Sequence, residues 1–264
     1  MRKPNRYEAI VSKIFFDRHK RGRAEVAFDR EDFAETATAL SIPLPKNLGD
    51  IIYSFRYRCA LPDDVLETAA AGKTWLIRSR GRGRYAFVQV RPVDIRPNEA
   101  LAETKIPNAT PGLIDMYALG DEQALLAKIR YNRLIDIFTG VTCYSLQSHL
   151  RTTVPDLGQI ETDEVYVGVD RRGAHFVFPV QAKGQRESLG VLQIEQDLAL
   201  CQAKFPDLNA RPIGAQFLQG EVLVLFEFED TSEGIRVVAE KHYRLVPPSE
   251  LTADEITRYA SRLE

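Results

Sequence analysis

Three acids and a Gln-x-Lys pair have the residue types and the spacing that hydrolytic chemistry needs. Glu161, Asp163 and Glu164 begin a strand-like segment, and Gln181 and Lys183 end a second apolar segment after a turn. Residues two apart in a strand share a face, so Glu161 and Asp163 point to the same side of their strand, and Gln181 and Lys183 point to the same side of theirs. If the two segments pair as a hairpin, both sets converge on one end of a sheet.

This set of side chains suits the hydrolysis of a phosphodiester. Mg²⁺ prefers oxygen ligands and keeps several waters, so one or two carboxylates and the side-chain oxygen of Gln181 suffice to hold it. The ammonium of Lys183 would orient the attacking water and stabilise charge that builds on phosphorus. The alternative interpretation is an edge hairpin whose polar ends are merely solvated.

The elements that must position these residues follow from hydrophobic periodicity. An apolar stripe predicts a long helix over 123–138, which Gly140 ends. Alternation predicts strands over 160–169 and 175–183. A capping-box sequence, Thr-Ala-Asp-Glu, opens a closing helix. The whole predicts an α/β arrangement with a mixed sheet. The remaining predicted elements are helices over 144–150, 187–205 and 252–263, and strands over 213–218, 222–228 and 235–245.

This region resembles the PD-(D/E)XK nuclease superfamily, which includes many restriction endonucleases. Asp163 matches the conserved acid of the family, 18 residues before Gln181, and Gln181 and Lys183 match its second motif. Glu122 falls near the start of the preceding helix, where many members place a further glutamate. The family usually has an acid where Gln181 stands, and the Gln-x-Lys version is similar to Mrr-like restriction enzymes. The resemblance covers about residues 120–205.

The resemblance implies a restriction-endonuclease-like mixed-sheet core and a Mg²⁺ cofactor, for which Mn²⁺ can substitute. It implies catalytic roles for Asp163, Gln181, Lys183 and Glu122. Gln181 removes one negative charge from the site, which weakens metal binding unless a neighbouring acid compensates. The choice between Asp163 and Glu164 as principal ligand stays open, because a shift of one residue exchanges strand faces. The candidate metal ligands are Asp163, Gln181, Glu161 and Glu164.

Charge is distributed unevenly along the chain. Residues 1–95 hold 18 Lys or Arg against 12 Asp or Glu, whereas residues 96–264 hold 17 against 25. A basic half joined to an acidic half indicates a nucleic-acid-binding domain beside a domain of another kind. Uneven sampling of surface charge is the alternative.

The basic half reads as three helices, over 29–40, 48–58 and 62–72, followed by a hairpin with strands over 74–78 and 85–90. This order resembles a winged helix, a helix-turn-helix variant with a β-hairpin wing. Arginines gathered near the wing tip suit contacts to phosphates or to the minor groove, although a solvated hairpin is the alternative. The predicted DNA-binding residues are Arg56, Arg58, Arg78, Arg80, Arg82 and Arg84.

Linker-like residues suggest how the chain divides. We expect a winged-helix-like α+β domain over 1–95, a linker over 96–112 and a nuclease-like domain over 113–264. No apolar run approaches the ~18–20 residues that a membrane span needs, and no apolar stretch follows the first residues as in a secretory signal. Three scattered cysteines without a CxxC pair fit a cytoplasmic protein without membrane partners.

These observations predict an enzyme, a Mg²⁺-dependent endonuclease for double-stranded DNA, for which a type II restriction endonuclease is the best fit. Cutting both strands normally needs two active sites, which favours a homodimer. A cognate DNA methyltransferase is then an expected genetic partner. The main alternative is a DNA-binding regulator with an inactive nuclease-like domain, and a nuclease for structured RNA is a further one.

Overall fold

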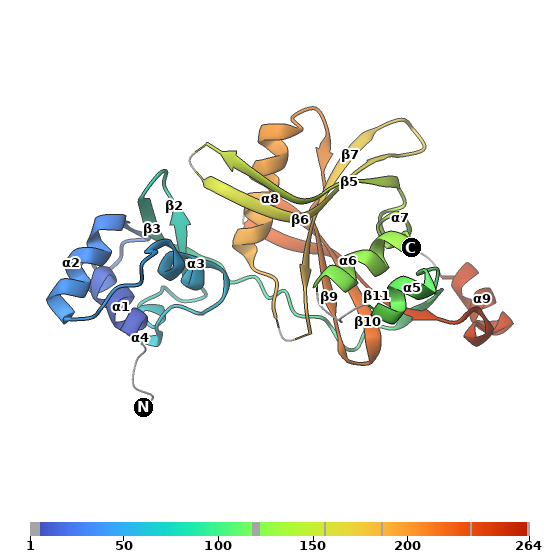
Figure 1. The fold of residues 1–264 in the computed structure, drawn as a ribbon, viewed down its shortest axis with the longest axis horizontal. Coiled ribbons are helices and arrows are strands. Elements are labelled where there is room, and N and C mark those ends of the chain that lie inside the picture. Colours follow the sequence, from blue (N-terminus) through green and yellow to red (C-terminus); the bar gives the residue numbers. More distant parts are fainter. Residues whose placement is uncertain (1–5, 118–121, 156, 186, 233, 263–264) are drawn as a thin grey trace.

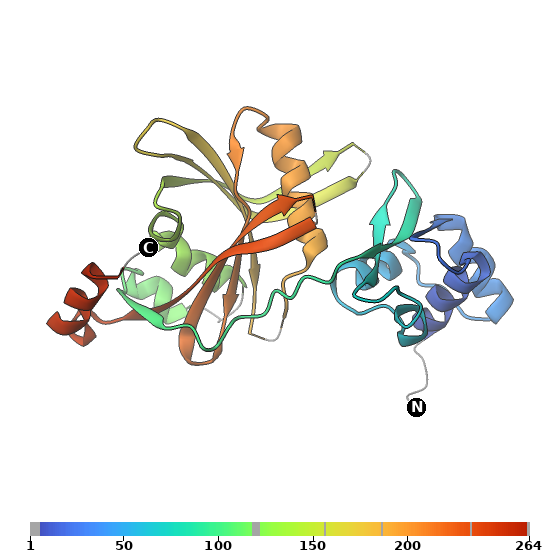
Figure 2. The same ribbon diagram turned by 180° about the vertical axis from the view of Figure 1, so that it is seen from behind.

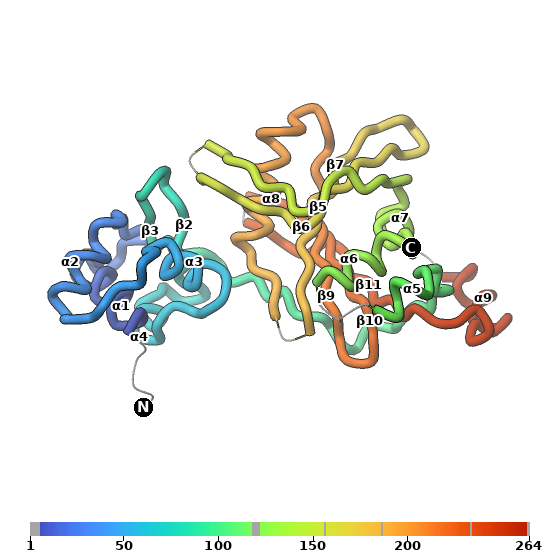
Figure 3. The backbone as a smooth tube through the Cα atoms, in the orientation of Figure 1, coloured from blue at the N-terminus to red at the C-terminus, as the bar shows by residue number. Residues whose placement is uncertain are grey.

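The computed structural model describes residues 6–117, 122–155, 157–185, 187–232 and 234–262. Figure 1 shows two bodies, a smaller amino-terminal one and a larger carboxy-terminal one built on a long twisted sheet. Residues 91–102 join them without forming a helix or strand, and Figure 3 follows this connection. Part of the connection is docked, because Ile95 packs into the carboxy-terminal core and the backbone N–H of Asn98 donates to Glu240.

The amino-terminal body is an α+β unit around one core, in which aromatic side chains such as Phe15, Trp75 and Phe87 pack together. Its three strands form an antiparallel sheet in the order β1-β3-β2. Two glycines at the hairpin tip, Gly81 and Gly83, have positive φ, which only glycine adopts readily. The elements are α1 (Arg6–Arg18), β1 (Glu25–Asp29), α2 (Arg30–Leu40), α3 (Gly49–Tyr57), α4 (Asp63–Leu66), β2 (Thr74–Ser79) and β3 (Arg84–Val90).

The carboxy-terminal body has a mixed sheet, which confirms the α/β class. Among the described residues the main strand order is β4-β11-β10-β9-β7-β6-β5, with β8 beside β7. Strand β7 is parallel to β9, and β4 is parallel to β11. The helices are α5 (Gly112–Tyr117), α6 (Glu122–Tyr131), α7 (Leu134–Thr139), α8 (Val191–Lys204) and α9 (Ala253–Ala260), with short 3₁₀ turns at Gln219–Glu221 and Pro248–Glu250. The strands are β4 (Glu103–Pro107), β5 (Thr142–Val154), β6 (Gly158–Val169), β7 (His175–Lys183), β8 (Asn209–Ala210), β9 (Ile213–Phe217), β10 (Val222–Thr231) and β11 (Gly234–Val246).

Helices cover both faces of this sheet, as Figures 1 and 2 show from opposite sides. Helices α6 and α7 pack with Phe178 and Val180 on one face. Helix α8 packs with Val165 and Val177 on the other. Alternation along β7 therefore sends neighbouring side chains to different layers, and Gln181 falls on the α8 side, where it contacts Asp197.

Several predicted elements differ from the structure. The helix expected over 144–150 is wrong, because these residues belong to β5 and pair along β6. The helix over 123–138 is broken after Tyr131, where Arg133 has a φ of 50° and the Asn132 side chain bonds Ala109 and Thr110. Helix α8 begins at Val191, not 187, and α4 ends before 72. Helix α1 and strand β1 were not predicted, and the expected linker contains β4.

Gly168 tests the packing of β6 against β5. A Cβ at Gly168 would lie 2.8 Å from Val141 Cγ1 and 2.9 Å from the carbonyl oxygen of Thr142. The paired backbone of β5 cannot shift to relieve this overlap without disturbing the sheet. Gly168→Ala should therefore lower the free energy of unfolding by about 1–3 kcal/mol. Gly112→Ala meets open space and should change it by less than about 1 kcal/mol. Urea denaturation measures both, and equal effects would contradict this packing.

Candidate functional site

A cavity of about 600 Å³ opens where β7 ends, beside the first half of β6 and the start of α6. It brings together five of the six catalytic and metal-ligand candidates from the sequence, namely Glu122, Glu161, Asp163, Gln181 and Lys183. Helix α3 of the amino-terminal body closes one side. The other lining residues are Tyr53, Tyr57, Arg58, His149, Glu187, Ser188 and Gln193.

Lys183 forms an ion pair with Glu122 across this cavity. Lys183 Nζ lies 2.8 Å from Glu122 Oε1, and the lysine side chain is only 15% exposed. Burial by itself lowers the pKa of Lys183, but the hydrogen bond and charge of Glu122 outweigh it, so the pKa rises above its usual value. Burial raises the pKa of Glu122, although Lys183 opposes the rise. The ammonium of Lys183 therefore stays charged at neutral pH.

Asp163 lies where the ladder between β6 and β7 stops. The last residue pair of this ladder joins Glu164 to Val180, and beyond it Asp163 Oδ2 accepts the backbone N–H of Ala182 at 2.8 Å. Burial raises the pKa of Asp163, against the lowering effects of that hydrogen bond and of the Lys183 charge. Its negative charge is thus costly unless a cation lies nearby.

Gln181 is held in one orientation by three polar contacts. Its Nε2 donates to Asp197 Oδ1 at 3.0 Å and to the backbone oxygen of Glu161 at 3.3 Å. Its Oε1 accepts from Gln193 Nε2 at 3.2 Å. Because Gln181 and Gln193 both line the cavity, this chain of amides fixes where the Gln181 oxygen lies.

Asp197 is a site residue that sequence reasoning missed. It is 1% exposed, and its Oδ1 accepts from Thr162 Oγ1 at 2.5 Å as well as from Gln181. Its Oδ2 has no hydrogen-bond partner among the described residues. Burial raises the pKa of Asp197 to about 7. The available signal was an acid on the apolar face of a helix, four residues after Gln193.

Glu164 does not contribute to this cavity, which corrects its prediction as a metal ligand. It is fully buried and faces the α6 layer, where it accepts from Arg130 Nε at 2.9 Å and Ser145 Oγ at 2.5 Å. Successive residues of a strand face opposite sides, so Asp163 alone of this pair reaches the cavity. Glu161 lines it from the margin, where it accepts from Arg151 Nε at 2.8 Å.

Two of the six arginines predicted to contact DNA have protein partners. Arg78 forms an ion pair with Glu195 of α8, and Arg80 forms two hydrogen bonds to Glu25, at 2.9 and 3.0 Å. The acids that pair with these two arginines come from distant parts of the chain, so the local sequence of the hairpin does not reveal them.

The other four arginines have different surroundings. Arg56 lies over the ring of Tyr57 at 5.0 Å, and Arg58 lies over Tyr53 at 4.9 Å. Arg82 and Arg84 at the hairpin tip are exposed and have no ion-pair partner within the described part of the chain. Arg56 and Arg82 line a second cavity that borders the first.

Comparison with protein-family models, curated proteins and solved structures finds no significant match to this chain. Within the described residues, no group of three or more His, Cys, Asp or Glu side chains is arranged to hold a metal ion. The same residues include no helix that is both long and apolar enough to span a bilayer.

Proposed function

We propose that this chain is a Mg²⁺-dependent endonuclease of the PD-(D/E)XK type that hydrolyses phosphodiester bonds in duplex DNA. The observation that carries the proposal is the convergence of Asp163, Gln181 and Lys183 in one cavity, with Glu122 paired to the lysine. The element order supports it: helix α6, acid-bearing β6, β7 ending in Gln-x-Lys, and then helix α8. That is the order of the core that the sequence resembles.

The oxygen donors in the cavity are few, which suits Mg²⁺ better than it suits a metal whose ligands all come from the protein. Asp163 supplies a buried carboxylate, and Gln181 supplies an amide oxygen that Gln193 orients. Mg²⁺ sites commonly use one or two carboxylates plus water and phosphate, so the absence of a cluster of three acids among the described residues is compatible with it. A bound Mg²⁺ would polarise the phosphodiester and lower the pKa of a water. Lys183, held charged by Glu122, would stabilise negative charge on the phosphate oxygens.

The amino-terminal body supports binding to DNA. Its order α1-β1-α2-α3-α4-β2-β3, with the exposed Arg82 and Arg84 at the hairpin tip, resembles a winged-helix module with the short helix α4 added before the hairpin. Helix α3 lines the candidate catalytic cavity, so this module lies where it can present substrate. Under this proposal a homodimer would cut both strands, and a cognate methyltransferase would protect the host DNA.

A second candidate function is a DNA-binding regulator whose nuclease-like domain is inactive. The observation in its favour is Gln181, which stands where the resembled family usually has a second acid and so leaves the site one charge short. The two functions make opposite predictions about cleavage.

Incubating plasmid DNA with the protein tests the proposal. We expect discrete fragments with Mg²⁺ or Mn²⁺ and none with EDTA. Asp163→Asn should abolish cleavage, because it removes the buried carboxylate while keeping the shape of the side chain. Asp17→Asn, the same change at an exposed site on α1, is the control and should cleave as wild type does.

If wild type never nicks DNA with either cation but binds it as Asp163→Asn does, the regulator is the correct function. A parallel digest of structured RNA decides the substrate, and faster cleavage of RNA than of duplex DNA would contradict the proposal.

A further inference from the structure

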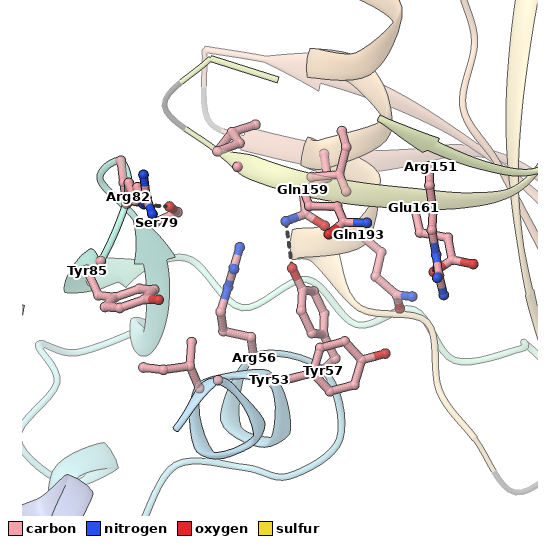
Figure 4. Close-up of a pocket in the computed structure, with 18 of the residues that line it drawn as sticks. Tyr53, Arg56, Tyr57, Ser79, Arg82, Tyr85, Arg151, Gln159, Glu161 and Gln193 are labelled. Atoms are coloured by element: carbon pink, nitrogen blue, oxygen red, sulfur yellow. Dashed lines mark hydrogen bonds and ion pairs between the residues drawn. The ribbon is translucent and has the colours of Figure 1, made fainter. Parts of the chain in front are cut away.

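A second cavity, of about 660 Å³, lies between the two bodies and borders the candidate catalytic cavity. Figure 4 shows its walls: α3 below, the β2–β3 hairpin on one side, and the β5–β6 hairpin with α8 above. Both cavities are lined by Tyr53, Tyr57, Glu161 and Gln193. A molecule in the second cavity would therefore lie next to Asp163 and Lys183.

Four planar side chains, three on α3 and one on the residue that follows it, lie against one another between the two cavities. The ring centroids of Tyr53 and Tyr57 are 4.9 Å apart, Arg56 lies over Tyr57, and Arg58 lies over Tyr53. We call these four residues the α3 planar set. Tyr53 is 49% exposed, and Figure 4 shows Arg56 and Tyr57 pointing from α3 toward the strands and α8, with Tyr53 beside Tyr57. Aromatic rings and guanidinium planes are the groups on which unpaired bases stack.

The charged and polar groups around the planar set suit a nucleotide. Arg56 Nε is buried and has no hydrogen-bond partner among the described residues. Arg82 and Arg151 also line the cavity, and the acid there, Glu161, is already bonded to Arg151. The walls thus offer positive charge for a phosphate. The side chains of Gln159 and Gln193 offer amide groups for the edge of a base. The volume lies within the ~300–1,000 Å³ usual for small-ligand pockets.

Helix α8 lies against part of α3 and the β2–β3 hairpin, which restricts the access of an intact duplex to α3. The hydroxyl of Tyr57 accepts from Gln196 Nε2 of α8 at 2.6 Å, and Arg78 pairs with Glu195 of the same helix. A helix that enters the major groove needs clear access to a groove about 12 Å wide, whereas α8 covers part of this face. A single nucleotide displaced from its stack requires far less room.

We infer that the second cavity binds an unpaired nucleotide of the nucleic-acid substrate, with its base on the α3 planar set and its phosphate near Arg56 and Arg82. This inference rests on the proposed nuclease function and specifies that, in the bound substrate, a base beside the scissile bond is unpaired, either beforehand or because it is extruded from the duplex on binding. Extruding a base from a duplex costs least where it is mismatched or already unpaired. The protein should therefore prefer such sites.

The inference is tested by binding in EDTA, which keeps cleavage out of the measurement. The probes are a perfect DNA duplex containing 2-aminopurine and the same duplex with that base unpaired as a bulge. We expect the full-length protein to bind the bulged probe more tightly and to change its emission on binding. Tyr53→Ala and Arg56→Ala should each weaken bulge binding about 5- to 150-fold, with little effect on the perfect duplex. Tyr53→Phe keeps the ring and should retain the preference.

Tyr144→Ala, at an exposed tyrosine of β5, is the control and should bind both probes as wild type does. Equal affinity of wild type for the two probes would overturn the inference. So would an equal loss on both probes in Tyr53→Ala and Arg56→Ala, because α3 would then contact only the backbone. Failure of the nuclease proposal is separate: both the plasmid and the bulged duplex would stay intact with Mg²⁺ and Mn²⁺ while the preference for the bulge in EDTA persisted.

Discussion

Replacing Lys183 with alanine is expected to lower the rate of DNA cleavage by about 10²–10³-fold, the usual cost of losing one electrostatic contact to the transition state. The structure gives the reason. The Lys183 ammonium is mostly buried, is held by Glu122 at 2.8 Å, and shares a cavity with Asp163 and Gln181. Affinity for DNA should change little, because one buried lysine contributes little to contacts spread over the whole interface. Single-turnover cleavage with Mg²⁺ and binding in EDTA separate the two effects.

Two further variants sharpen this test. Lys241→Ala removes an exposed lysine of β11 and should cleave at the wild-type rate. Glu122→Gln keeps a hydrogen-bond acceptor for Lys183 but removes the charge, so its loss of rate should be smaller than that of Lys183→Ala. Cleavage by Lys183→Ala at the wild-type rate would show that the lysine has only a structural role, and would remove the main support for the proposed chemistry.

The sequence was sufficient to place the central residues because their spacing matches strand geometry. The alternation around Val165 and the apolar run before Gln181 correctly indicated two strands, and these pair in the structure. The position of Glu164 could not be deduced, since adjacent acids in a strand face opposite layers and the sequence does not show which layer holds the cavity. Asp197 was not predicted as a site residue because its role depends on contacts between α8 and β7, and no local sequence pattern indicates such contacts.

The errors in secondary structure have a related cause. Strand β5 pairs with β6 on one side at the end of the main strand path, and most of its residues are exposed on both faces. No face is consistently buried, so the residues around Tyr144 and Leu146 lack the alternation that marks a half-buried strand. The break after Tyr131 depends on Asn132, whose side chain bonds residues 109 and 110. That is a tertiary contact, and periodicity cannot predict it.

The arginines show the same limit for charge. Counting residues correctly found a basic half, but net charge says nothing of pairing. Arg80 meets Glu25 because β1 lies beside β3, and Arg78 meets Glu195 because α8 approaches the amino-terminal body. The sequence gives the number of charged residues, whereas the fold determines which of them pair. Arg82 and Arg84 are exposed without an ion-pair partner among the described residues.

In the metal-free protein, the stability of Asp197→Asn relative to wild type is expected to increase as pH rises from about 5 to about 8. The pKa of Asp197 is about 7 in the folded protein and about 3.9 in an unfolded chain. Between these values the folded state binds more protons than the unfolded state, so wild type loses stability as pH rises. The total loss is about 4 kcal/mol, and it is complete only above the folded pKa. Asparagine does not titrate, so the variant escapes this loss.

Asparagine keeps an oxygen to accept from Gln181 and Thr162, but it places an unpaired N–H₂ where Oδ2 lies, at a cost of about 1–3 kcal/mol at every pH. The difference in unfolding free energy between variant and wild type should therefore move in favour of the variant with pH, whatever its starting sign. Asp197→Ala removes the acceptor of the Thr162 hydroxyl and one of the two acceptors of Gln181 Nε2, so it should be less stable than Asp197→Asn throughout. Urea denaturation in EDTA at several pH values measures these differences. A constant difference between Asp197→Asn and wild type across that range would mean that Asp197 ionises normally, so that it carries a negative charge beside Gln181 at neutral pH and supplies the charge that the Gln-x-Lys motif lacks.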